Sequence, residues 1–558
     1  VLRGPYSALY GNSSAGVVQV FSAGGNPPGF YSAFSGGSYG GRRAAYAARG
    51  VDGALEYGLS ADYFGTDGYR GHSAAQRWIG NGQLRYDFGS GGTLEVLGSS
   101  IDLPEAQDPL GLTATQLATD RTQATLPAVQ FNTRKRVHQY QGGLVWEKKF
   151  SDALSLRVMG YGGHRAIGQV LSTPVAAQTG SPLNSGGVVD LGSVYDGGDA
   201  RLQYQLGALQ LTGGFSYDRQ DQHRRGYENF SGAQMGVQGK LRRDEQDDVY
   251  NVDEYLQADW RFAQRWSLLA GVRHSEVLFA SNDAYIVAGN PDDGGSRNYA
   301  ATTPVAGLMF RASDALHLYA SYGAGFETPT FTEMAYRPDG SAGLNLGLDE
   351  ARSNNFEIGA KHRADGRSIE AALFEADARN ELAVFSNSNG RTTYHNIDRA
   401  RRRGAELSAS QDFSSHWNVS LAYTWVQAQF ETAFANCATP ASCTINGGTP
   451  IPGVPRNDLY TELRWQVASG WHAGINAQAL SRVYADDAGT QHAAGYALLG
   501  ADAGWSAPRH DARLSLYLRG ENLTGARYVG SVIVNEANGR YFEPAPGRTF
   551  FAGASLRY

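Results

Sequence analysis

Apolar and polar residues alternate with a period of two along most of the chain. The alternation is clear in residues 54–64, 417–425 and 512–520, where every second side chain is apolar and those between are polar or small. A period of two places alternate side chains on opposite faces of an extended strand. The pattern therefore predicts a chain built of β-strands, each with one apolar and one polar face.

The connections between these strands come in two lengths that take turns along the sequence. Very short turns are predicted at Asp52-Gly53, Ser151-Asp152, Gly207-Ala208, Ala263-Gln264, Ser313-Asp314, Asp365-Gly366, Ser414-Ser415 and Ser469-Gly470. Long polar connections are predicted at about 102–132, 169–186, 222–246, 280–296, 326–351, 432–454 and 523–546. This segregation indicates strands that run up and down between two unlike sides, which a soluble β-sandwich has no reason to show.

The fold class predicted from this pattern is all-β, a transmembrane antiparallel β-barrel of about 22 strands over residues 29–558. An even number of strands puts both ends of the barrel on the short-turn side. A barrel of this size has a lumen too wide for its own side chains to fill, and such transporters carry a plug. Aromatic residues near strand ends would form an interfacial girdle, with ordinary β-propensity as the alternative explanation: Tyr63, Phe64, Trp425, Trp471 and Trp505.

Composition and charge agree with this prediction and exclude other classes. Gly (71) and Tyr (31) are abundant among the 558 residues, and the net charge of −6 offers no basic face for nucleic acid. No run of 18 apolar residues predicts a membrane helix, whereas a membrane strand needs only about 9–11 residues of alternating polarity. Neither G-x-x-x-x-G-K-[ST] nor H-E-x-x-H occurs. We expect no enzyme activity, no cofactor and no resident metal.

The two cysteines lie close together in a polar, proline-containing stretch. Cys437 and Cys443 are predicted to form a small disulfide in an external loop, in an oxidising compartment. The alternative is a metal site, but no second Cys/His pair lies nearby.

Several motifs, in order, resemble one family. The opening stretch carries Leu2-Arg3-Gly4-Pro5, Ser7-Ala8-Leu9-Tyr10-Gly11 and Ala15-Gly16-Val17-Val18. Further matches are "YGAGFETPTFTEM" at 322–334, "ARSNNFEIGAK" at 351–361, "RRRGAELSAS" at 401–410 and "PAPGRTFFAGASLRY" at the end. In this order they resemble the TonB-dependent outer-membrane receptors, with one minor departure, where the family's second glycine is Val17.

The resemblance implies an organisation and a location. Residues 1–28 would be the C-terminal remnant of a plug domain and residues 29–558 the barrel. We expect the signal peptide, the TonB-binding box and most of the plug to lie upstream of a fragment. The protein would sit in the outer membrane of a Gram-negative cell as a monomer, with both barrel ends periplasmic and the long loops extracellular. Tyr558 resembles the terminal aromatic residue that the family uses for insertion by the barrel-assembly machinery.

The resemblance also implies active uptake of an iron–siderophore ligand, driven by the TonB–ExbB–ExbD complex. Cobalamin, haem, copper and saccharide receptors share the scaffold, so the fold does not fix the ligand. A passive porin and an outer-membrane hydrolase are the alternatives from other classes. The plug-like opening stretch argues against the porin.

The resemblance further implies a contact between plug and wall. The family's Arg in the R-G-P motif contacts glutamates on two barrel strands, which correspond to Arg3, Glu357 and Glu406 here. An Arg fork between carboxylates is a charge-assisted, geometrically demanding contact. The alternative is that these glutamates pair with a wall arginine such as Arg402 or Arg403.

Two predicted loops place Arg beside Tyr or Phe on the long-loop side. They are residues 223–230, between strands expected at 208–221 and 247–262, and residues 330–340. A guanidinium next to an aromatic face suits an anionic or aromatic ferric siderophore. The candidate ligand-binding residues are Arg224, Arg225, Tyr227, Tyr336 and Arg337; solvated loop residues or sites for surface polyanions are the alternative.

Overall fold

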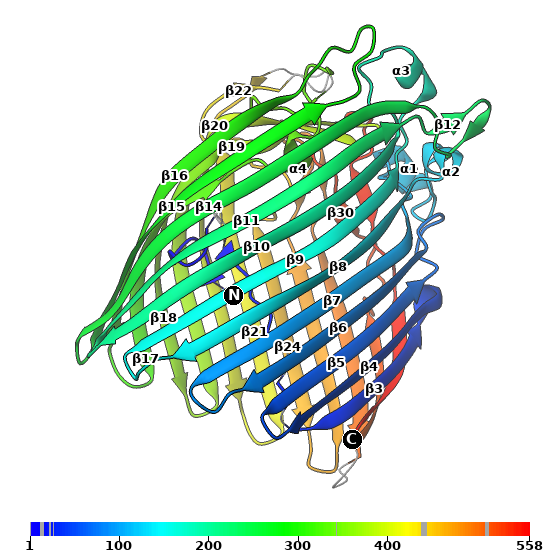
Figure 1. Cartoon of the computed structure of the whole chain (residues 1–558). Helices are drawn as coiled ribbons and strands as arrows, with labels where there is room; N and C mark the ends of the chain where they lie inside the picture. The colour runs from blue at the N-terminus through cyan, green and yellow to red at the C-terminus, as the bar shows by residue number, and fades with distance from the viewer. Residues whose placement is uncertain are drawn as a thin grey trace.

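A closed barrel of 22 antiparallel strands forms most of the molecule, in a computed structural model (Figure 1). The structure describes residues 2–11, 16–21, 24–25, 27–341, 343–436, 444–507 and 513–558. The all-β class and the strand number predicted from the alternation are confirmed. The barrel closes where the first strand of the wall pairs with the last, from Tyr31 opposite Arg557 to Gly37 opposite Phe551.

The wall strands are between 9 and 23 residues long, and the shortest lie near the two ends of the chain. Their bounds are β3 Gly29–Gly37, β4 Gly41–Asp52, β5 Leu55–Thr66, β6 Ala75–Asp87, β7 Gly92–Gln107, β8 Arg134–Lys149, β9 Leu154–Val170, β10 Val188–Leu206, β11 Leu209–Tyr227, β14 Leu241–Ala263, β15 Trp266–Asp283, β16 Gly295–Arg311, β17 Leu316–Glu327, β18 Ala351–Ala364, β19 Arg367–Ser388, β20 Arg391–Asp412, β21 Trp417–Phe430, β24 Asn457–Gln466, β25 Trp471–Leu480, β28 Tyr496–Ser506, β29 Arg513–Glu521 and β32 Thr549–Arg557.

Small elements decorate the loops and the lumen. Two-strand ladders join β1 Leu2–Arg3 to β2 Gly16–Val17, β12 Phe230–Ser231 to β13 Gln234–Met235, β22 Phe434–Ala435 to β23 Thr444–Ile445, β26 Val483–Tyr484 to β27 His492–Ala493, and β30 Val529–Val532 to β31 Phe542–Pro544. The helical turns are η1 Ser38–Gly40, α1 Ala114–Thr119, α2 Leu126–Phe131, α3 Val175–Thr179 and α4 Phe331–Met334. No helix among the described residues is both long and apolar enough to cross a membrane.

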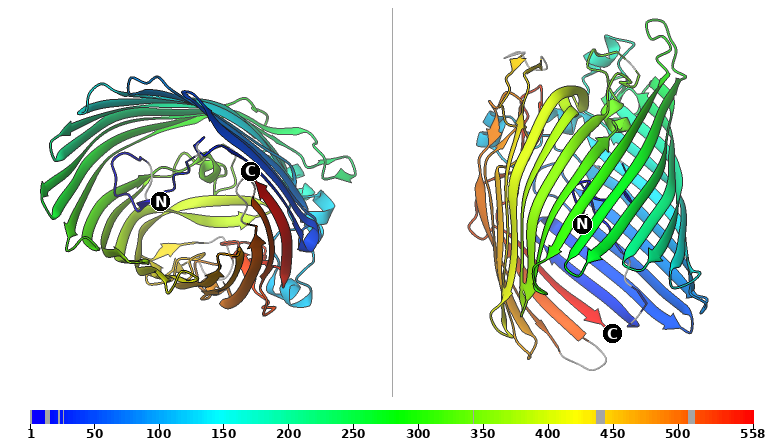
Figure 2. Two further views of the ribbon diagram at one scale, coloured as in Figure 1. Left: turned by 90° about the horizontal axis from the view of Figure 1, so that it is seen from below. Right: turned by 90° about the vertical axis from the view of Figure 1, so that its left-hand side faces the viewer.

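The two ends of the barrel differ as the connection lengths predict. Short turns gather at one end, and α1 to α4 and the small ladders of the loops gather at the other, whereas the β1–β2 ladder lies inside the barrel (Figures 1 and 2). All eight short turns predicted from the sequence join neighbouring strands at the short-turn end. The loop-bearing end is called the outer end below.

Two connections at the outer end depart from the predicted rule. Only the three residues of η1, 38–40, separate β3 from β4. Only residues 389–390 separate β19 from β20, and each of these strands is 22 residues long. The two long strands of this hairpin extend past the wall at the outer end and take the place of a long loop.

The predicted loop at 222–246 is wrong at both of its ends. Residues 222–227 belong to β11 and residues 241–246 to β14, so only residues 228–240 connect the two strands. The ladder continues with Arg224 opposite Glu245 and Arg225 opposite Asp244. Both faces of this extension are polar, so the alternation of apolar and polar residues that marks a strand disappears.

Side chains on the two faces of the wall meet different surroundings. On β18, Phe356 and Ile358 are more than half exposed on the outside, whereas Glu357 between them faces inward. Aromatic pairs lie near the short-turn end, with Trp471 and Trp505 at 6.4 Å and Trp266 and Phe310 at 4.6 Å between ring centroids. The outer surface is therefore apolar with an aromatic rim, as a membrane barrel requires.

Candidate functional site

The N-terminal segment, residues 2–11 and 16–21, lies inside the barrel (Figure 2). Its Ser7 hydroxyl and Ala8 amide both donate to the Gln257 side-chain oxygen, at 3.0 and 3.1 Å. The Arg273 guanidinium donates to the Ala8 carbonyl at 3.2 Å. The wall thus recognises the backbone of this segment, so its position depends on side chains from β14 and β15.

Small residues let the segment approach the wall closely. A Cβ at Gly11 would lie 2.3 Å from Arg273 Nε, and a Cβ at Gly323 on β17 would lie 2.1 Å from the Pro5 carbonyl oxygen. Ala8 is fully buried against Tyr255 and Val305. The glycines are needed here for space rather than for backbone conformation.

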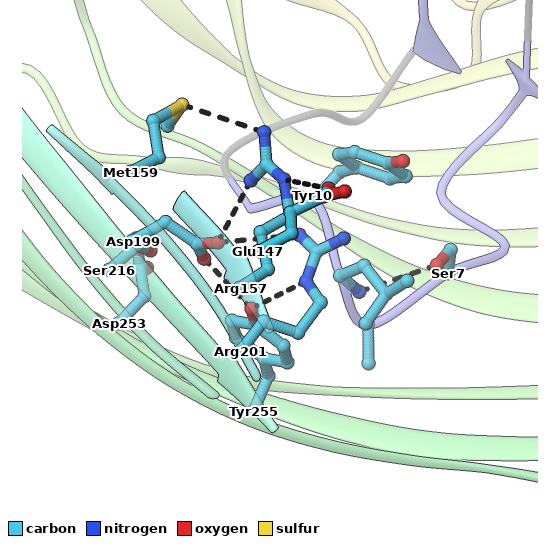
Figure 3. Close-up of polar contacts among 12 residues, drawn as sticks. Ser7, Tyr10, Glu147, Arg157, Met159, Asp199, Arg201, Ser216, Asp253 and Tyr255 are labelled. Atoms are coloured by element: carbon cyan, nitrogen blue, oxygen red, sulfur yellow. Dashed lines mark hydrogen bonds and ion pairs between the residues drawn. The ribbon is translucent and has the colours of Figure 1, made fainter. Parts of the chain in front are cut away.

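A group of lumen-facing charges supports this seat; we call it the Tyr255 cluster (Figure 3). Its members are Arg157, Asp199, Arg201, Asp253, Tyr255 and Arg273. The Tyr255 hydroxyl donates to Asp199 at 2.8 Å and accepts from Arg201 Nε at 3.1 Å. The guanidinium carbons of Arg273 and Arg201 lie 5.1 and 5.8 Å from the Tyr255 ring centroid.

Every arginine of the Tyr255 cluster has a carboxylate partner. Arg273 Nη2 lies 2.7 Å from a carboxylate oxygen of Asp253, and the two side chains are only 5% and 2% exposed. Arg157 and Arg201 approach Asp199 at 3.5 and 3.8 Å. Charges balanced in this way stabilise a fixed arrangement, because removing one partner leaves the other buried and uncompensated.

The predicted contact of Arg3 with two glutamates can be followed only from the wall side. Glu357 on β18 accepts a hydrogen bond from Tyr319 at 2.7 Å, and Glu406 lies two strands away on β20. Their pairing partners, Phe374 and Ala372 on β19, are two residues apart, so both carboxylates occupy one region of the inner face. The side chain of Arg3 lies outside the described residues.

A cavity of about 1520 Å³ extends from the N-terminal segment towards the outer end. Tyr10 and Val17 line its base, the inner faces of β8 to β11 form one side, and Arg224 and Tyr336 line its upper part. The cavity therefore connects the Tyr255 cluster to the loops.

Two outer elements cross the mouth above this cavity and form a roof. One is the loop of residues 328–350, whose short helix α4 begins at Thr330 with a capping box to Glu333 and packs Phe331 and Met334 against β15 to β17. The other is the tip of the β19–β20 hairpin. There, Arg391 Nη2 donates to Asn184 Oδ1 at 3.0 Å and the Asn389 carbonyl accepts from Thr173 at 3.3 Å, on the far side of the mouth.

Three arginines converge on Tyr336 under the roof; we call this the Tyr336 cluster. The guanidinium carbons of Arg391, Arg224 and Arg243 lie 5.1, 5.3 and 5.9 Å from the Tyr336 ring centroid. Burial alone would raise the pKa of the Tyr336 hydroxyl, but the charges of Arg224, Arg391 and Arg243 lower this pKa below its ordinary value. Arg224 and Tyr336, predicted from separate stretches, thus meet in one site.

The other predicted ligand residues take different places. Arg225 is on the opposite face of β11 from Arg224 and pairs with Asp190 at 2.8 Å. Tyr227 ends β11 and is partly buried, and Arg337 approaches Asp339 in its own loop at 3.6 Å. Tyr558 is exposed beside β3, where its amide and carbonyl bond to Phe30. The predicted disulfide of Cys437 and Cys443 lies outside the described residues.

Four important residues were missed from the sequence: Gln257, Arg273, Arg243 and Arg391. The first two act on the N-terminal segment, and no local pattern announces that contact. The stretch "LRRDEQDD" at 241–248 did carry a signal, since alternate charges on an extended strand share one face. Arg391 could not have been placed, because its hairpin crosses the mouth.

The described residues contain no group of three or more His, Cys, Asp or Glu side chains arranged to hold a metal ion. Ser38 sits in a G-x-S-x-G spacing, Gly36–Gly40, which in hydrolases requires a strand–turn–helix context. Here the turn joins two strands, and the Ser38 hydroxyl accepts from the Phe550 amide at 2.9 Å.

Comparisons with known proteins give a consistent answer. The family model described as TonB dependent receptor-like, beta-barrel matches residues 19–523. The chain is 24% identical over 324 residues to the "Probable TonB-dependent siderophore receptor PiuA" of Acinetobacter baumannii. That match covers 56% of this chain and 41% of the relative, so the chain matches about two fifths of that protein's length.

Solved structures share the fold over the whole chain. The unliganded ferric citrate transporter FecA matches with a TM-score of 0.81 at 18% identity, covering 100% of this chain and 83% of that one. The copper transporter OprC matches with a TM-score of 0.78 at 16% identity, covering 100% and 84%. At such identities the likeness concerns the fold alone, and the two names show that one scaffold serves different cargoes.

Proposed function

The chain belongs to the TonB-dependent receptor β-barrel family, and from this we propose that it takes part in active uptake of a ferric siderophore across the outer membrane. A barrel of this family resides in the outer membrane, and the family is one of receptors rather than of enzymes. The siderophore, the energy source and the direction of transport are our proposal.

One observation carries the choice of ligand: Arg224 and Tyr336 line the upper part of the same large cavity. Buried guanidinium groups beside an aromatic ring suit a chelate that carries carboxylate, phenolate or catecholate oxygens. The name of the siderophore receptor PiuA supports an iron chelate. Copper, haem, cobalamin and saccharide remain the alternatives within the family.

The partners follow from the same proposal. The TonB–ExbB–ExbD complex would act on the N-terminal part of the protein, of which residues 1–28 would be the end and residues 29–558 the barrel. Arg3 would join this end to Glu357 and Glu406, and Tyr558 would guide insertion by the barrel-assembly machinery of the outer membrane. The firm seat of Ser7 and Ala8 on Gln257 and Arg273 supports a coupling between this segment and the wall.

The test is uptake of radioactive iron by a Gram-negative strain that lacks its own siderophore receptors and expresses the full-length receptor gene that contains this sequence. A panel of anionic and neutral ferric chelates should contain at least one that enters, and deletion of tonB should abolish entry. Uptake that persists without TonB would instead indicate a passive pore. If no iron chelate enters and a copper, haem or cobalamin ligand does, the ferric siderophore is the wrong cargo and that ligand takes its place in the proposal.

Single substitutions then test the ligand residues. We expect Arg224→Gln to lower affinity about tenfold or more, as expected when a charge-assisted contact of about 1.5–3 kcal/mol is lost. Arg225→Gln, Tyr227→Phe and Arg337→Gln test the remaining candidates one at a time. An equal loss of affinity in all four variants would indicate that the ligand binds to a broad loop surface. Unchanged affinity in Arg224→Gln would show that the ligand does not bind in this cavity.

A further inference from the structure

Three arginines of the Tyr336 cluster, Arg224, Arg243 and Arg391, face two buried carboxylates, Glu245 and Asp247, so positive charge is in excess by one. Among the described residues, Arg243 pairs with Glu245, whereas Arg224 and Arg391 make no ion pair within 4 Å. Arg224 and Arg243 are each only 5% exposed. A buried cation without a close anion is costly, so this arrangement favours binding of a further negative charge.

Some buried polar atoms of the Tyr336 cluster also lack hydrogen-bond partners. Arg243 Nη2 and Arg391 Nε are buried and have no hydrogen-bond partner among the described residues. The Tyr336 ring gives Arg243 and Arg391 a cation–π contact, and the Tyr336 side chain also hydrogen-bonds to Arg224. Both contacts are weaker than a hydrogen bond to a charged oxygen. Two carboxylate oxygens of the same region, Glu245 Oε2 and Asp247 Oδ2, are likewise buried without a hydrogen-bond partner. The sign of a missing ligand is therefore that, among the described residues, neither Arg224 nor Arg391 has an ion-pair partner.

The cluster also fastens the roof to the wall. Tyr336 belongs to the roof loop, and the preceding Ala335 carbonyl accepts from Arg243 Nη1 on β14 at 3.0 Å. Arg391 comes from the tip of the hairpin, and Arg224 from β11 of the wall. A ligand that replaced Tyr336 among these arginines would break the contact that holds both roof elements together.

We propose that Tyr336 occupies the place of an anionic oxygen of the ligand, and that an anionic ferric chelate displaces Tyr336 and loosens the roof. The inference rests on the proposed function and narrows its substrate to chelates with a net negative charge. Carboxylate, phenolate or catecholate oxygens would accept hydrogen bonds from Arg224 and Arg391, with the N–H groups as donors. No covalent step is involved.

The experiment measures binding of two probes to the purified chain in detergent by equilibrium dialysis. One probe is the anionic ferric tris-catecholate and the other the neutral ferric tris-acetohydroxamate. Four proteins are compared: the unchanged chain, Arg224→Gln, Tyr336→Ala and the control Arg219→Gln. Arg219 lies on the same strand as Arg224 and borders the same cavity, but its charge is already paired, since its Nε donates to Asp248 at 2.9 Å.

We expect Arg224→Gln to weaken binding of the anionic probe about tenfold and Tyr336→Ala to strengthen it about tenfold, each corresponding to about 1.4 kcal/mol. Arg219→Gln should leave it unchanged, and the neutral probe should respond to none of the substitutions. The heat-induced gel shift of a folded barrel confirms that each variant is intact.

Three results would overturn the proposal. Weaker anion binding by Tyr336→Ala would make Tyr336 a contact rather than a placeholder. An equal effect of Arg224→Gln and Arg219→Gln would show that Arg224 has no special role in binding the anion. No binding of the anionic probe by either the unchanged chain or Tyr336→Ala would show that the cluster is not an anion site. These binding results are independent of TonB-driven uptake, so a failure of the proposed transport function would show separately in the cell assay.

Discussion

The Tyr255 and Tyr336 clusters are built from the same parts and differ in one respect. In each, arginines from several strands surround a tyrosine ring inside the barrel. In the Tyr255 cluster every arginine has a carboxylate within 4 Å, whereas in the Tyr336 cluster only Arg243 does among the described residues. Balanced charges fix an internal contact, and unbalanced ones leave a place for a ligand.

The largest effect is expected when Arg273 is removed from the Tyr255 cluster, in which every arginine has a carboxylate partner. Arg273→Met should destabilise the seat of the N-terminal segment by about 3–5 kcal/mol, because Asp253 would stay buried without its partner. Hydrogen exchange of residues 5–11 should rise accordingly. Asp253→Asn with Arg273→Met should recover part of the loss; unchanged exchange in the single variant would show that the ion pair does not hold the segment.

A second substitution tests the same seat by size alone. Gly11→Ala would place a Cβ 2.3 Å from Arg273 Nε, and we expect a cost of about 1–3 kcal/mol from the displaced guanidinium. Gly192→Ala on β10 is the control, since nothing lies within 4 Å of its Cβ position. The same hydrogen-exchange measurement should separate the two; equal behaviour would mean that Arg273 moves aside freely.

The third prediction is that removing an arginine from the Tyr336 cluster does not lower the local stability, unlike the same change in the Tyr255 cluster. Without ligand, Arg224→Met should leave the local stability of β11 and the roof unchanged or raise it by about 1 kcal/mol, because it removes an uncompensated buried charge. Protection factors for residues 220–227 and 331–337 measure it. A destabilisation as large as that of Arg273→Met would mean that the two clusters are equivalent structural contacts.

The smallest expected effect is a dependence on pH of the loop at 284–294, which contacts the roof. Burial, with the nearby Asp283 and Glu245 carboxylates, raises the pKa of Asp293 to about 6, against the opposing charges of Arg243 and Arg337. Because the folded pKa lies above the unfolded value, the full local stability is present below about pH 4 and is lost as the pH rises through 6. Asp293 also lies against Gly343 of the roof loop.

Asp293→Asn should remove this dependence, and Asp292→Asn is the control, since Asp292 is exposed and can keep its turn contact as Asn. Protection factors of residues 284–294, corrected for intrinsic exchange, are compared at pH 4.5 and 6.5. A pH slope that survives in Asp293→Asn would assign it to another group.

How far the sequence predicts this molecule depends on where the chain touches lipid. Within the membrane span one face is apolar, so alternation and turn spacing located the strands and eight short turns. Above it both faces are polar, and the extension of β11 through Tyr227 could not be distinguished from a loop. The pairing of Arg224 with Tyr336 could be anticipated only as residue types suited to one ligand, whereas Arg391 and Arg273 act across the lumen and leave no local pattern.

Hydrogen exchange of the purified chain with and without ferric tris-catecholate tests most directly whether the two clusters have different roles. The account predicts faster exchange of residues 331–337 when the probe is bound, because Tyr336 leaves its arginines, and no change at residues 5–11, where the charges are already balanced. Slower exchange at 331–337, or a change of equal size at 5–11, would contradict it.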